Sequence, residues 1–479
     1  MSSSVDGLVS GLSTSSLISS LMQVEAAPQN RLKTKVQTAE NTVASYMSVN
    51  SKLGALKSSA DTLGQLPTWR ALQATSSSTT VTATATGGTN SAAGSTTFDV
   101  ISTASAQVAT MEYAAGNNDA TGNNGTKLTF RFGTPPGAPV EVALGTSKKP
   151  ADIAAAINGT KGLNVRAGVV TTSTGATVLQ LSSTKPGTEN AFQVTGLSNG
   201  VLPEPTVVTA AEDAKIRVGR LAGPSEPEYI LPGDPGYPAL SPGSYEVKSS
   251  SNTFTGLIAG VSVTVTKPEV GVTVSANIDT AGIAEKMQAF VDAANAVLEE
   301  VSAQTAYDPN TKKSSPLTGD FMVRELSSKI MGSISGGLSY ANPKFNELAP
   351  VDPVTNPKTL SFGSLSQFGI QLERSGKLSF KASEFVAAYQ ADPAKIQEAV
   401  IGMADNFEEQ TSKQAGSVTS VILGRRQEID NFNAQISNWD TRLAARKLAL
   451  QKQYTNLETA LGNLKNQSNW LAGQLGGLG

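Results

Sequence analysis

The chain has 479 residues and a formal net charge of −2, and only 16% of its residues are charged, against about 25% in typical globular proteins. It has neither cysteine nor histidine, which excludes disulfides, thiolate chemistry, histidine bases and nearly every zinc site, so we expect no cofactor and no metal. The balanced charge argues against nucleic-acid binding, and without an apolar run of about 18 residues we expect no membrane insertion.

The N-terminal region predicts two helices. The second follows Pro28, has apolar residues at three-and-four spacing, and ends before Pro67. The first basic side chain of the chain is Arg31, so the start lacks the basic region of a secretion signal and no cleaved signal peptide is expected. The first helix carries a stripe of leucines, namely Leu8, Leu12, Leu17 and Leu21.

The middle of the chain changes to Ser, Thr, Ala and Gly with short alternating runs, which is typical of strands. A strand, strand, helix, hairpin order predicts a compact α+β unit of about ninety residues. Around it, further short strands and a hairpin of 261–265 with 270–278 predict a second β domain, interrupted by a proline-rich exposed loop at 222–243. The elements of the α+β unit are expected at 127–132, 139–144, 151–157, 165–171 and 177–181.

Helical character resumes after the β region. Asp279 and Asp320 each stand where a side chain would cap a helix. A hairpin is expected at 368–380 with its turn at Gly376, and short helices are expected near Phe385 and Ile396.

An aliphatic residue then recurs every seventh position to the end of the chain. The pattern predicts one helix of about 75 Å whose apolar stripe packs against another helix. A seam against other helices and a long amphipathic helix lying on its own domain both remain open interpretations. The stripe consists of Ile422, Ile429, Ile436, Leu443, Leu450, Leu457, Leu464 and Leu471.

Together these elements predict a multidomain α+β protein. Discontinuous terminal helical domains, a coiled coil and a bundle, would enclose two inserted β-rich domains. The expected domains are a coiled-coil leg (1–40 with 430–479), a helical bundle (41–75 with 280–429), a β-rich domain (76–110 with 200–279) and an inserted outer α+β domain (111–199).

Four short segments carry a resemblance to a known family. The first segment is the start of the chain, Val5-Asp6-Gly7-Leu8-Val9-Ser10-Gly11-Leu12. The other three are Gly260–Val265, Gly319-Asp320 with Val323-Arg324, and Phe368-Gly369-Ile370 with Gly376-Lys377-Leu378. In this order they resemble flagellar hook-associated protein 2, the filament cap family. The chain departs from that pattern near Val400, where an aromatic residue is missing, and in the proline-rich loop.

The resemblance implies a secreted, extracellular cap at the tip of the bacterial flagellum, without enzymatic activity. The family forms a ring-like homo-oligomer of about five subunits, which promotes the folding and insertion of exported flagellin and prevents its loss to the medium. Other implied partners are the hook-filament junction protein, the flagellar export apparatus and an export chaperone. Export would follow the flagellar type III route. The leucine stripes at both ends would be the interface of the leg helices.

Three alternatives stand beside this interpretation. A glycosidase would need two converging carboxylates, but Glu212-Asp213 and Glu299-Glu300 are chain neighbours whose side chains diverge. A flagellar-tip adhesin would use the Ser/Thr-rich domains in cell adhesion. A hook-filament junction protein would share the heptad ends and the low charge.

Overall fold

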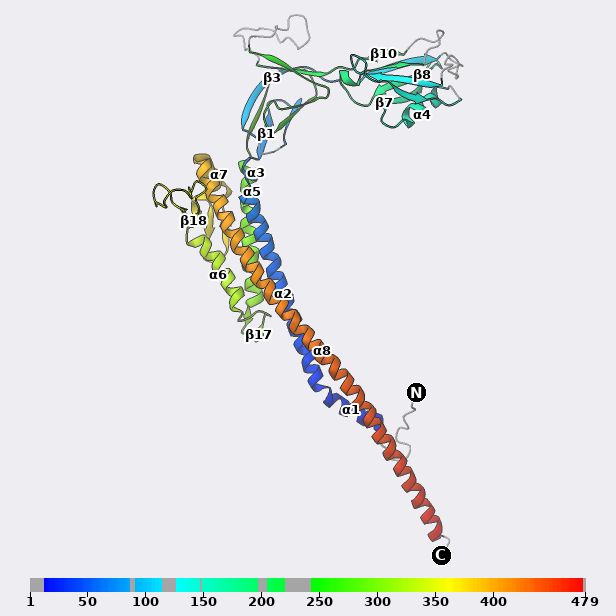
Figure 1. Cartoon of the computed structure of the whole chain (residues 1–479), viewed down its shortest axis with the longest axis vertical. Helices are drawn as coiled ribbons and strands as arrows, with labels where there is room; N and C mark the ends of the chain where they lie inside the picture. Colours follow the sequence, from blue (N-terminus) through cyan, green and yellow to red (C-terminus); the bar gives the residue numbers. More distant parts are fainter. Residues whose placement is uncertain are drawn as a thin grey trace. The chain divides into compact units, whose positions relative to one another are not determined.

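The computed structural model describes residues 13–86, 91–113, 126–146, 149–196, 205–219 and 243–476. The chain divides into two compact units, a helical unit built from the two ends of the chain and a β unit from Leu66 to Gly282 (Figure 1). The helical unit comprises the residues up to Gln65 and those from Ile283 onward. None of the described helices is both long enough and apolar enough to cross a membrane.

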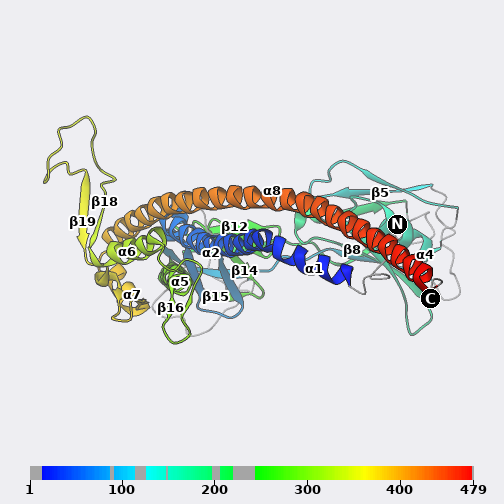
Figure 2. The same ribbon diagram turned by 90° about the horizontal axis from the view of Figure 1, so that it is seen from below.

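The helical unit is organised around two long helices that lie side by side (Figures 1 and 2). Three strand pairs connect or cover its helices. Its helices are α1 (Thr14–Glu25), α2 (Ala27–Gly64), α5 (Thr280–Thr305), α6 (Phe321–Ser335), η2 (Leu365–Phe368), α7 (Ala382–Ala391) and α8 (Pro393–Gly476). The strand pairs are β16 (Tyr307–Asp308) with β17 (Lys313–Ser314), β18 (Leu338–Ala341) with β19 (Thr359–Gly363), and β20 (Ile370–Leu372) with β21 (Leu378–Phe380).

The core of the helical unit forms where α2, α5, α6 and α8 converge. The aliphatic face of α2 is fully buried there, and each such leucine contributes about 2 kcal/mol by leaving water. Phe290 of α5 meets Phe407 of α8 edge to face, with ring centroids 5.1 Å apart. The fully buried residues of α2 are Val49, Leu53, Leu56, Ala60 and Leu63.

Both predicted helix caps are confirmed. Asp279 accepts a hydrogen bond from the backbone N–H of Gly282 at 2.8 Å, and Asp320 accepts one from that of Val323 at 3.1 Å. The hairpin of β20 and β21 is also confirmed, and it turns at Gly376, whose φ of 81° is the left-handed conformation that glycine allows.

The short helix expected near Ile396 is wrong, because α8 begins at Pro393 and runs unbroken for 84 residues. At about 1.5 Å per residue this helix is roughly 126 Å long. The glycines within α8 do not interrupt it, and Gly402 lies where the Tyr340 side chain packs directly on the backbone of α8. Its missing side chain is a packing requirement and does not end the helix.

The β unit contains two hydrophobic cores. The first lies between a five-stranded and a three-stranded sheet. The five-stranded sheet has the order β1 (Leu72–Ser76), β15 (Glu269–Ile278), β3 (Gly94–Ser102), β11 (Ala214–Val218), β12 (Tyr245–Ser249). The three-stranded sheet has the order β13 (Thr253–Thr255), β14 (Val261–Val265), β2 (Val81–Ala85). The short helix α3 (Leu66–Trp69) precedes β1.

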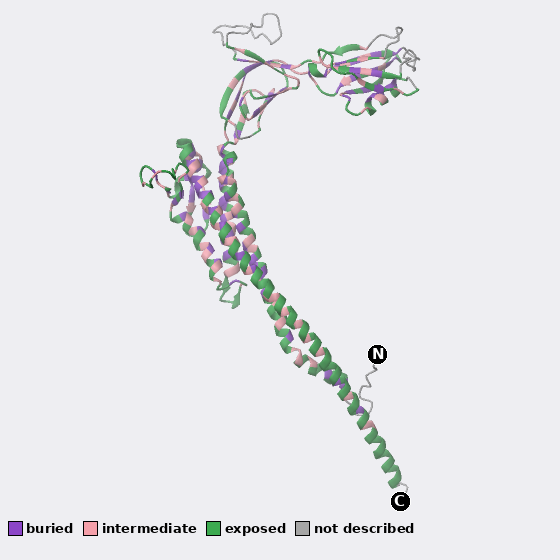
Figure 3. Ribbon diagram, in the orientation of Figure 1, coloured by how far each residue is buried: buried purple, intermediate pink, exposed green. Residues whose placement is uncertain are grey.

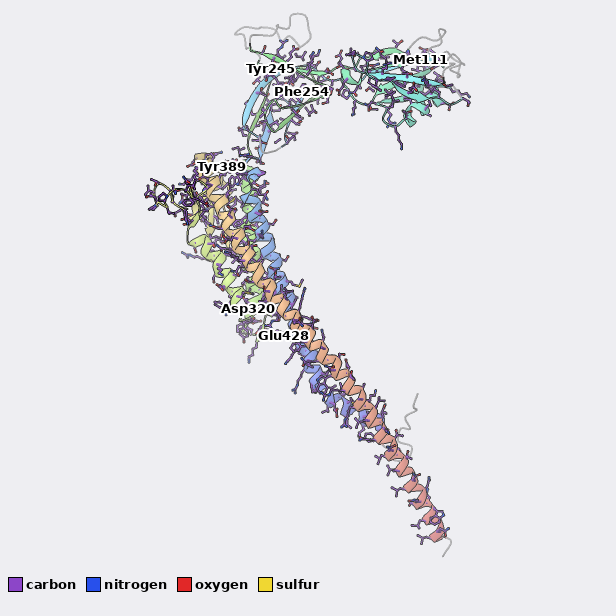
Figure 4. All side chains as sticks on the ribbon, viewed as in Figure 1. Met111, Tyr245, Phe254, Asp320, Tyr389 and Glu428 are labelled. Atoms are coloured by element: carbon purple, nitrogen blue, oxygen red, sulfur yellow. The ribbon has the colours of Figure 1, made fainter. Side chains whose placement is uncertain are left out.

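The second core is that of the inserted α+β domain, where all five predicted elements are present. Its centre includes Met111 and Phe130, both essentially inaccessible to water (Figure 4 labels Met111). One sheet has the order β10 (Thr206–Thr209), β4 (Val108–Tyr113), β8 (Thr177–Ser183), β7 (Val165–Thr171). The other has the order β6 (Val140–Ala143), β5 (Lys127–Phe132), β9 (Phe192–Thr195), and the helices are α4 (Pro150–Gly159) and η1 (Thr188–Asn190).

The predicted hairpin of 261–265 with 270–278 is wrong. Both segments are strands, but β14 pairs with β13 and β2, whereas β15 pairs with β1 and β3. The same core contains Val261, Val263 and Val265 of β14 and Val272 and Val274 of β15, which enter it from two opposed sheets, whereas Val270 is not part of it. Alternation identifies the inward face of a strand but not its hydrogen-bonding neighbour. The alternating pattern alone therefore could not distinguish a hairpin from two strands in different sheets.

The expected fold class is confirmed, with helices from both ends and two β-rich parts between them. Helices α2 and α8 continue without a break through residues 40 and 430, the expected boundaries between leg and bundle. A leg domain and a bundle domain would therefore share two continuous helices, and the four-part division stays a prediction.

Candidate docking surface on the terminal helices

Helices α2 and α8 form an antiparallel pair. Gln29, near the start of α2, donates to the carbonyl of Ile436 at 3.4 Å and to the side chain of Asp440. Further along α2, Asn50 donates to Thr419 at 3.4 Å. Higher residue numbers of α2 thus pair with lower residue numbers of α8, so the two helices are antiparallel. These contacts hold the N-terminal and C-terminal parts of the chain together along most of α2.

Helix α1 continues this pairing toward the C-terminal end of α8. Its Glu25 accepts a hydrogen bond from Arg446 at 2.9 Å within an exposed ion pair. Ile18 and Thr14 of α1 are each only 7% exposed, and Leu450 of α8 is 6% exposed. The apolar seam of this helix pair is therefore short, and few side chains hold it.

The heptad stripe of α8 changes from buried to exposed along the helix (Figure 3). Ile422 and Leu450 are buried, while Ile429, Ile436 and Leu443 are half-buried. A strict seven-residue repeat drifts about 20° per heptad around a straight helix, so one stripe cannot face one neighbour throughout. The last three members are exposed, with Leu457 at 46%, Leu464 at 60% and Leu471 at 55%.

The predicted stripe of α1 is divided in the same way. Leu17 and Leu21 are 46% and 42% exposed and lie outside the seam, which Ile18 occupies instead. Val24, one turn further on, is 74% exposed. Leu8 and Leu12 lie outside the described residues.

Three further apolar side chains of α8 are exposed, but only Leu475 lies on the face of the stripe leucines. Successive helical residues turn by about 100°, which places Leu448 opposite Leu457 and Trp470 to one side of the stripe. Trp470 and Leu475 are each 65% exposed near the end of α8, and Leu448 is 67% exposed. We call Leu17, Leu21 and Val24 with Leu457, Leu464, Leu471 and Leu475 the leg surface. Trp470 directly precedes a stripe leucine, so a search of positions flanking the heptad would have found it. Isolated exposed leucines are ordinary, but a row of them on paired helices indicates a binding surface.

A groove of about 390 Å³ runs between α2 and α8 above the leg surface. Lys35 of α2 lies over the ring of Phe432 on α8, 5.6 Å from its centroid. Arg425 forms an ion pair of 2.8 Å with Glu428, which raises the pKa of the Arg425 guanidinium. Both charges and an aromatic ring thus border the groove, which favours contact with another polypeptide over an enclosed small ligand.

Above the groove, the hydroxyl of Tyr46 on α2 donates to the carboxylate of Asp320, the residue that caps α6. Burial first and this hydrogen bond second raise the pKa of Tyr46 to about 12. Figure 4 labels Asp320 at the start of α6 and Glu428 on α8. The contact fixes α6 on the helix pair at the point where the bundle begins.

The acidic pairs considered for catalysis have structural partners. Asp213 accepts two hydrogen bonds from Thr188, at 2.7 and 2.8 Å. Lys377 pairs with Glu299 and lowers the pKa of that carboxyl, while Glu300 accepts from Gln304 at 2.9 Å. Among the described residues, no group of three or more Asp or Glu side chains could hold a metal ion.

Comparison with known proteins adds independent observations. The family description "Flagellar hook-associated protein 2 C-terminus" matches residues 242–466, and "Flagellar hook-associated protein 2 N-terminus" matches residues 10–107. The crystal structure of the flagellar cap protein FliD D1-D2-D3 domains from Escherichia coli aligns with a TM-score of 0.55 at 19% identity, over 80% of this chain and 99% of that one.

Two curated relatives carry the same family name. Lateral flagellar hook-associated protein 2 of Vibrio parahaemolyticus is 22% identical over 304 residues, 62% of this chain and 60% of the relative. Flagellar hook-associated protein 2 of Salmonella typhimurium is 26% identical over 258 residues, 49% of this chain and 50% of the relative. The chain therefore spans less than two thirds of the length of either relative.

Antiparallel terminal helices with exposed leucines and an inserted β unit define a class of multidomain protein with a surface suited to contact with other chains. Within that class, the two family matches cover both ends of the helical unit and, in the β unit, residues 66–107 and 242–282 next to them. The chain belongs to the flagellar hook-associated protein 2 family.

Proposed function

We propose that the protein caps the distal tip of the bacterial flagellar filament, outside the cell. It forms a ring-like homo-oligomer there, promotes the folding and insertion of flagellin subunits that arrive by the flagellar type III route, and prevents their escape. Membership of the hook-associated protein 2 family, with matches at both ends of the chain, is the observation that carries this proposal. The same matches favour a cap over a hook-filament junction subunit.

The leg surface is the part of the chain that we assign to the filament. Its exposed leucines would bury their side chains in grooves between flagellin helices, and each buried leucine would contribute about 2 kcal/mol. The stripe residues Leu457, Leu464 and Leu471, with Leu17 and Leu21, are the side chains of this proposed interface. The half-buried Ile429, Ile436 and Leu443 and the buried Leu450 would hold the legs together within a subunit, and Leu8 and Leu12 would extend the leg.

A short seam suits a cap that must move. The cap has to grip a helical lattice and step as each subunit is added, so its legs must reposition without unfolding the rest of the protein. The α1 seam has only a few buried side chains, and its ion pair between Glu25 and Arg446 is exposed and therefore weak, at about 0 to 1 kcal/mol. Opening this seam would cost little compared with opening the bundle.

The test is deletion of the gene followed by recovery of flagellin. We expect flagellin monomer in the medium and bare hooks, both restored to normal by the full chain. Electron microscopy of the purified protein should show a ring, which a junction subunit would not form. Normal filament growth in the deletion strain would contradict the proposal.

A further inference from the structure

The four-stranded sheet of the inserted α+β domain has two unpaired edges. Its order is β10, β4, β8, β7, and no described strand pairs with the outer side of β10 or of β7 (Figure 1). Apolar side chains are exposed on both edge strands, with Val207 at 52% and Val208 at 65% on β10, and Val169 at 39% and Val170 at 54% on β7. Unpaired backbone groups beside exposed apolar side chains are the features that a strand of another chain binds.

The outer side of β7 is blocked over its first half. The side-chain amide of Asn158 on α4 donates to the carbonyl of Ala167 at 2.8 Å and accepts from the backbone N–H of Ala167 at 3.0 Å. The pairing of β7 with β8 is regular, so the residues at odd positions all direct their backbone groups outward, as Ala167 does. Val169 and Thr171 therefore present their N–H and C=O groups outward beyond the blocked residue.

The outer side of β10 is open at Val207. Ser183 donates to the carbonyl of Gln107 at 2.9 Å, so the residues at odd positions of β4 bond to β8. Ala109 is one of these residues, and Val207 is aligned with it, so Val207 directs its backbone groups away from β4. The pairing is irregular directly after Val207, at the exposed Val208. We call residues 169–171 of β7 and 206–208 of β10 the open edges.

The open edges lack the charges that other edge strands of the β unit carry. Strands β6 and β12 are also at the edges of their sheets, and they carry Glu141 on β6 and Glu246 and Lys248 on β12. Natural sheets use such charges to prevent pairing with another chain. The open edges consist of valine and threonine alone, which are residues that favour strands. Their composition therefore favours pairing where that of β6 and β12 opposes it.

A second copy of this chain supplies the complementary edge. In a sheet of four antiparallel strands the outer two run in opposite directions, so a copy added in the same orientation places its β10 antiparallel to β7 of the first. Within one sheet the open edge of β10 is level with residues 166–168, whereas that of β7 begins at 169. Neighbouring copies would thus be staggered by about three residues, roughly 10 Å along the strands, and such a stagger accompanies the strand tilt of closed sheets. Neither open edge carries a charge that would repel its own copy.

We infer that β10 of one subunit pairs with β7 of a second copy of this chain, so that the four-stranded sheets of neighbouring subunits become continuous. The exposed valines of the two open edges then become cross-strand neighbours and leave water. The contact joins two different edges, so its repetition closes a ring when the rotation between neighbours permits. This inference rests on the proposed function, because it supplies a contact for the proposed homo-oligomer.

Cysteine pairing tests the contact directly, because the chain has no cysteine of its own. The full chain carrying Val170→Cys and Val208→Cys should give a ladder of covalent oligomers on mild oxidation, since each copy supplies both partners. The matched control moves the first cysteine to the charged edge strand β12, at the equally exposed Tyr245, and Tyr245→Cys with Val208→Cys should give no ladder.

Three outcomes of this experiment would contradict a proposal. Covalent dimers from Val208→Cys alone would show that β10 pairs with β10 and would overturn the inferred contact. Oligomers that sediment normally but give no more cross-linking than the control would overturn the inference and leave the proposed function standing. A monomer at all concentrations would contradict both.

Self-association of edge variants provides the second measurement. Val208→Lys should keep the thermal transition of the protein, because the side chain is exposed, yet weaken self-association at least about tenfold, whereas Tyr245→Lys should leave it unchanged. Asn158→Ala removes the block at Ala167 and lengthens the open edge of β7, so it should strengthen self-association several-fold. If neither Val208→Lys nor Asn158→Ala changes self-association, the inference is wrong. If Val208→Lys forms normal oligomers but no longer retains flagellin, the open edge of β10 binds another protein, and the inference is wrong as well.

Discussion

At the scale of single residues, the helical unit depends on a few contacts that admit no substitute. Gly402 is one, because the ring and Cβ of Tyr340 occupy the space where a side chain would begin. Gly416 is the contrasting case, since nothing lies within 4 Å of a side chain added there. The same residue type in the same helix therefore has opposite roles.

We predict that Gly402→Ala destabilises the helical unit by about 1 to 3 kcal/mol, because the added methyl group forces Tyr340 off the helix. Gly416→Ala should instead stabilise it by about 0.5 to 1 kcal/mol, because alanine restricts the unfolded chain more than glycine. Chemical denaturation followed by circular dichroism measures both. Equal effects of the two changes would contradict the assigned contact.

The Tyr46 contact predicts a dependence on alkaline pH. The pKa of Tyr46 is raised to about 12 in the folded state against about 10 in an unfolded chain. Between these values the unfolded state loses its proton first, so the contribution of Tyr46 to stability is fully present below pH 10 and falls as the pH rises toward 12. Tyr46→Phe should lower stability at neutral pH by about 1 to 2 kcal/mol and flatten the alkaline decline. Tyr307→Phe, at a position 54% exposed, is the control and should leave the profile unchanged.

At the scale of elements, sequence periodicity predicted the helices, strand faces and caps well. Asp279 and Asp320 cap the expected helices because a cap needs only local geometry. Strand partners are set by contacts distant in sequence, which explains why the pairing of 261–265 with 270–278 was misread. The heptad stripe predicted a partner helix for α8. It did not predict where along α8 the stripe residues become exposed, because that point depends on the length of α1 and on the drift of the stripe around the helix.

The division of the stripe into covered and exposed members predicts two kinds of variant. Leu457→Asp lies on an exposed position and should change stability by no more than about 0.5 kcal/mol, yet abolish capping. Leu450→Asp places a charge in the α1–α8 seam and should open it, at a free-energy cost no larger than that of separating α1 from α8. Leu443→Asp, at a half-buried position, should also abolish capping while the β unit stays folded.

Limited proteolysis of α1 separates these outcomes from general unfolding. Cleavage within Thr14–Glu25 should accelerate in the Leu450→Asp protein and stay at the native rate in the Leu457→Asp protein. Recovery of flagellin from the medium then reports capping. A Leu457→Asp protein that supports normal filament growth would remove the leg surface from the proposed interface.

At the scale of the whole molecule, a β unit is inserted into a helical unit closed by the two ends of the chain. The chain enters the β unit beside the strand by which it leaves, because Leu72 of β1 pairs with Ile278 of β15. The backbone N–H of Asp279 also donates to the carbonyl of Ala71 at 2.8 Å. Both chain connections of the β unit therefore lie next to each other. This arrangement lets each of the two units keep its own core.

This connection predicts that residues 66–282 fold as an isolated fragment. The strands at its two ends pair with each other, and the described residues of its two cores all lie within the fragment. The fragment should therefore show the same cooperative thermal transition as one of two transitions in the full chain.

Val263→Asp, at a fully buried position of the first core, should shift that transition alone and leave the helical transition in place. If the isolated fragment were unfolded, or if Val263→Asp shifted both transitions equally, the two units would form one cooperative structure. Repositioning of the legs would then disturb the β unit as well.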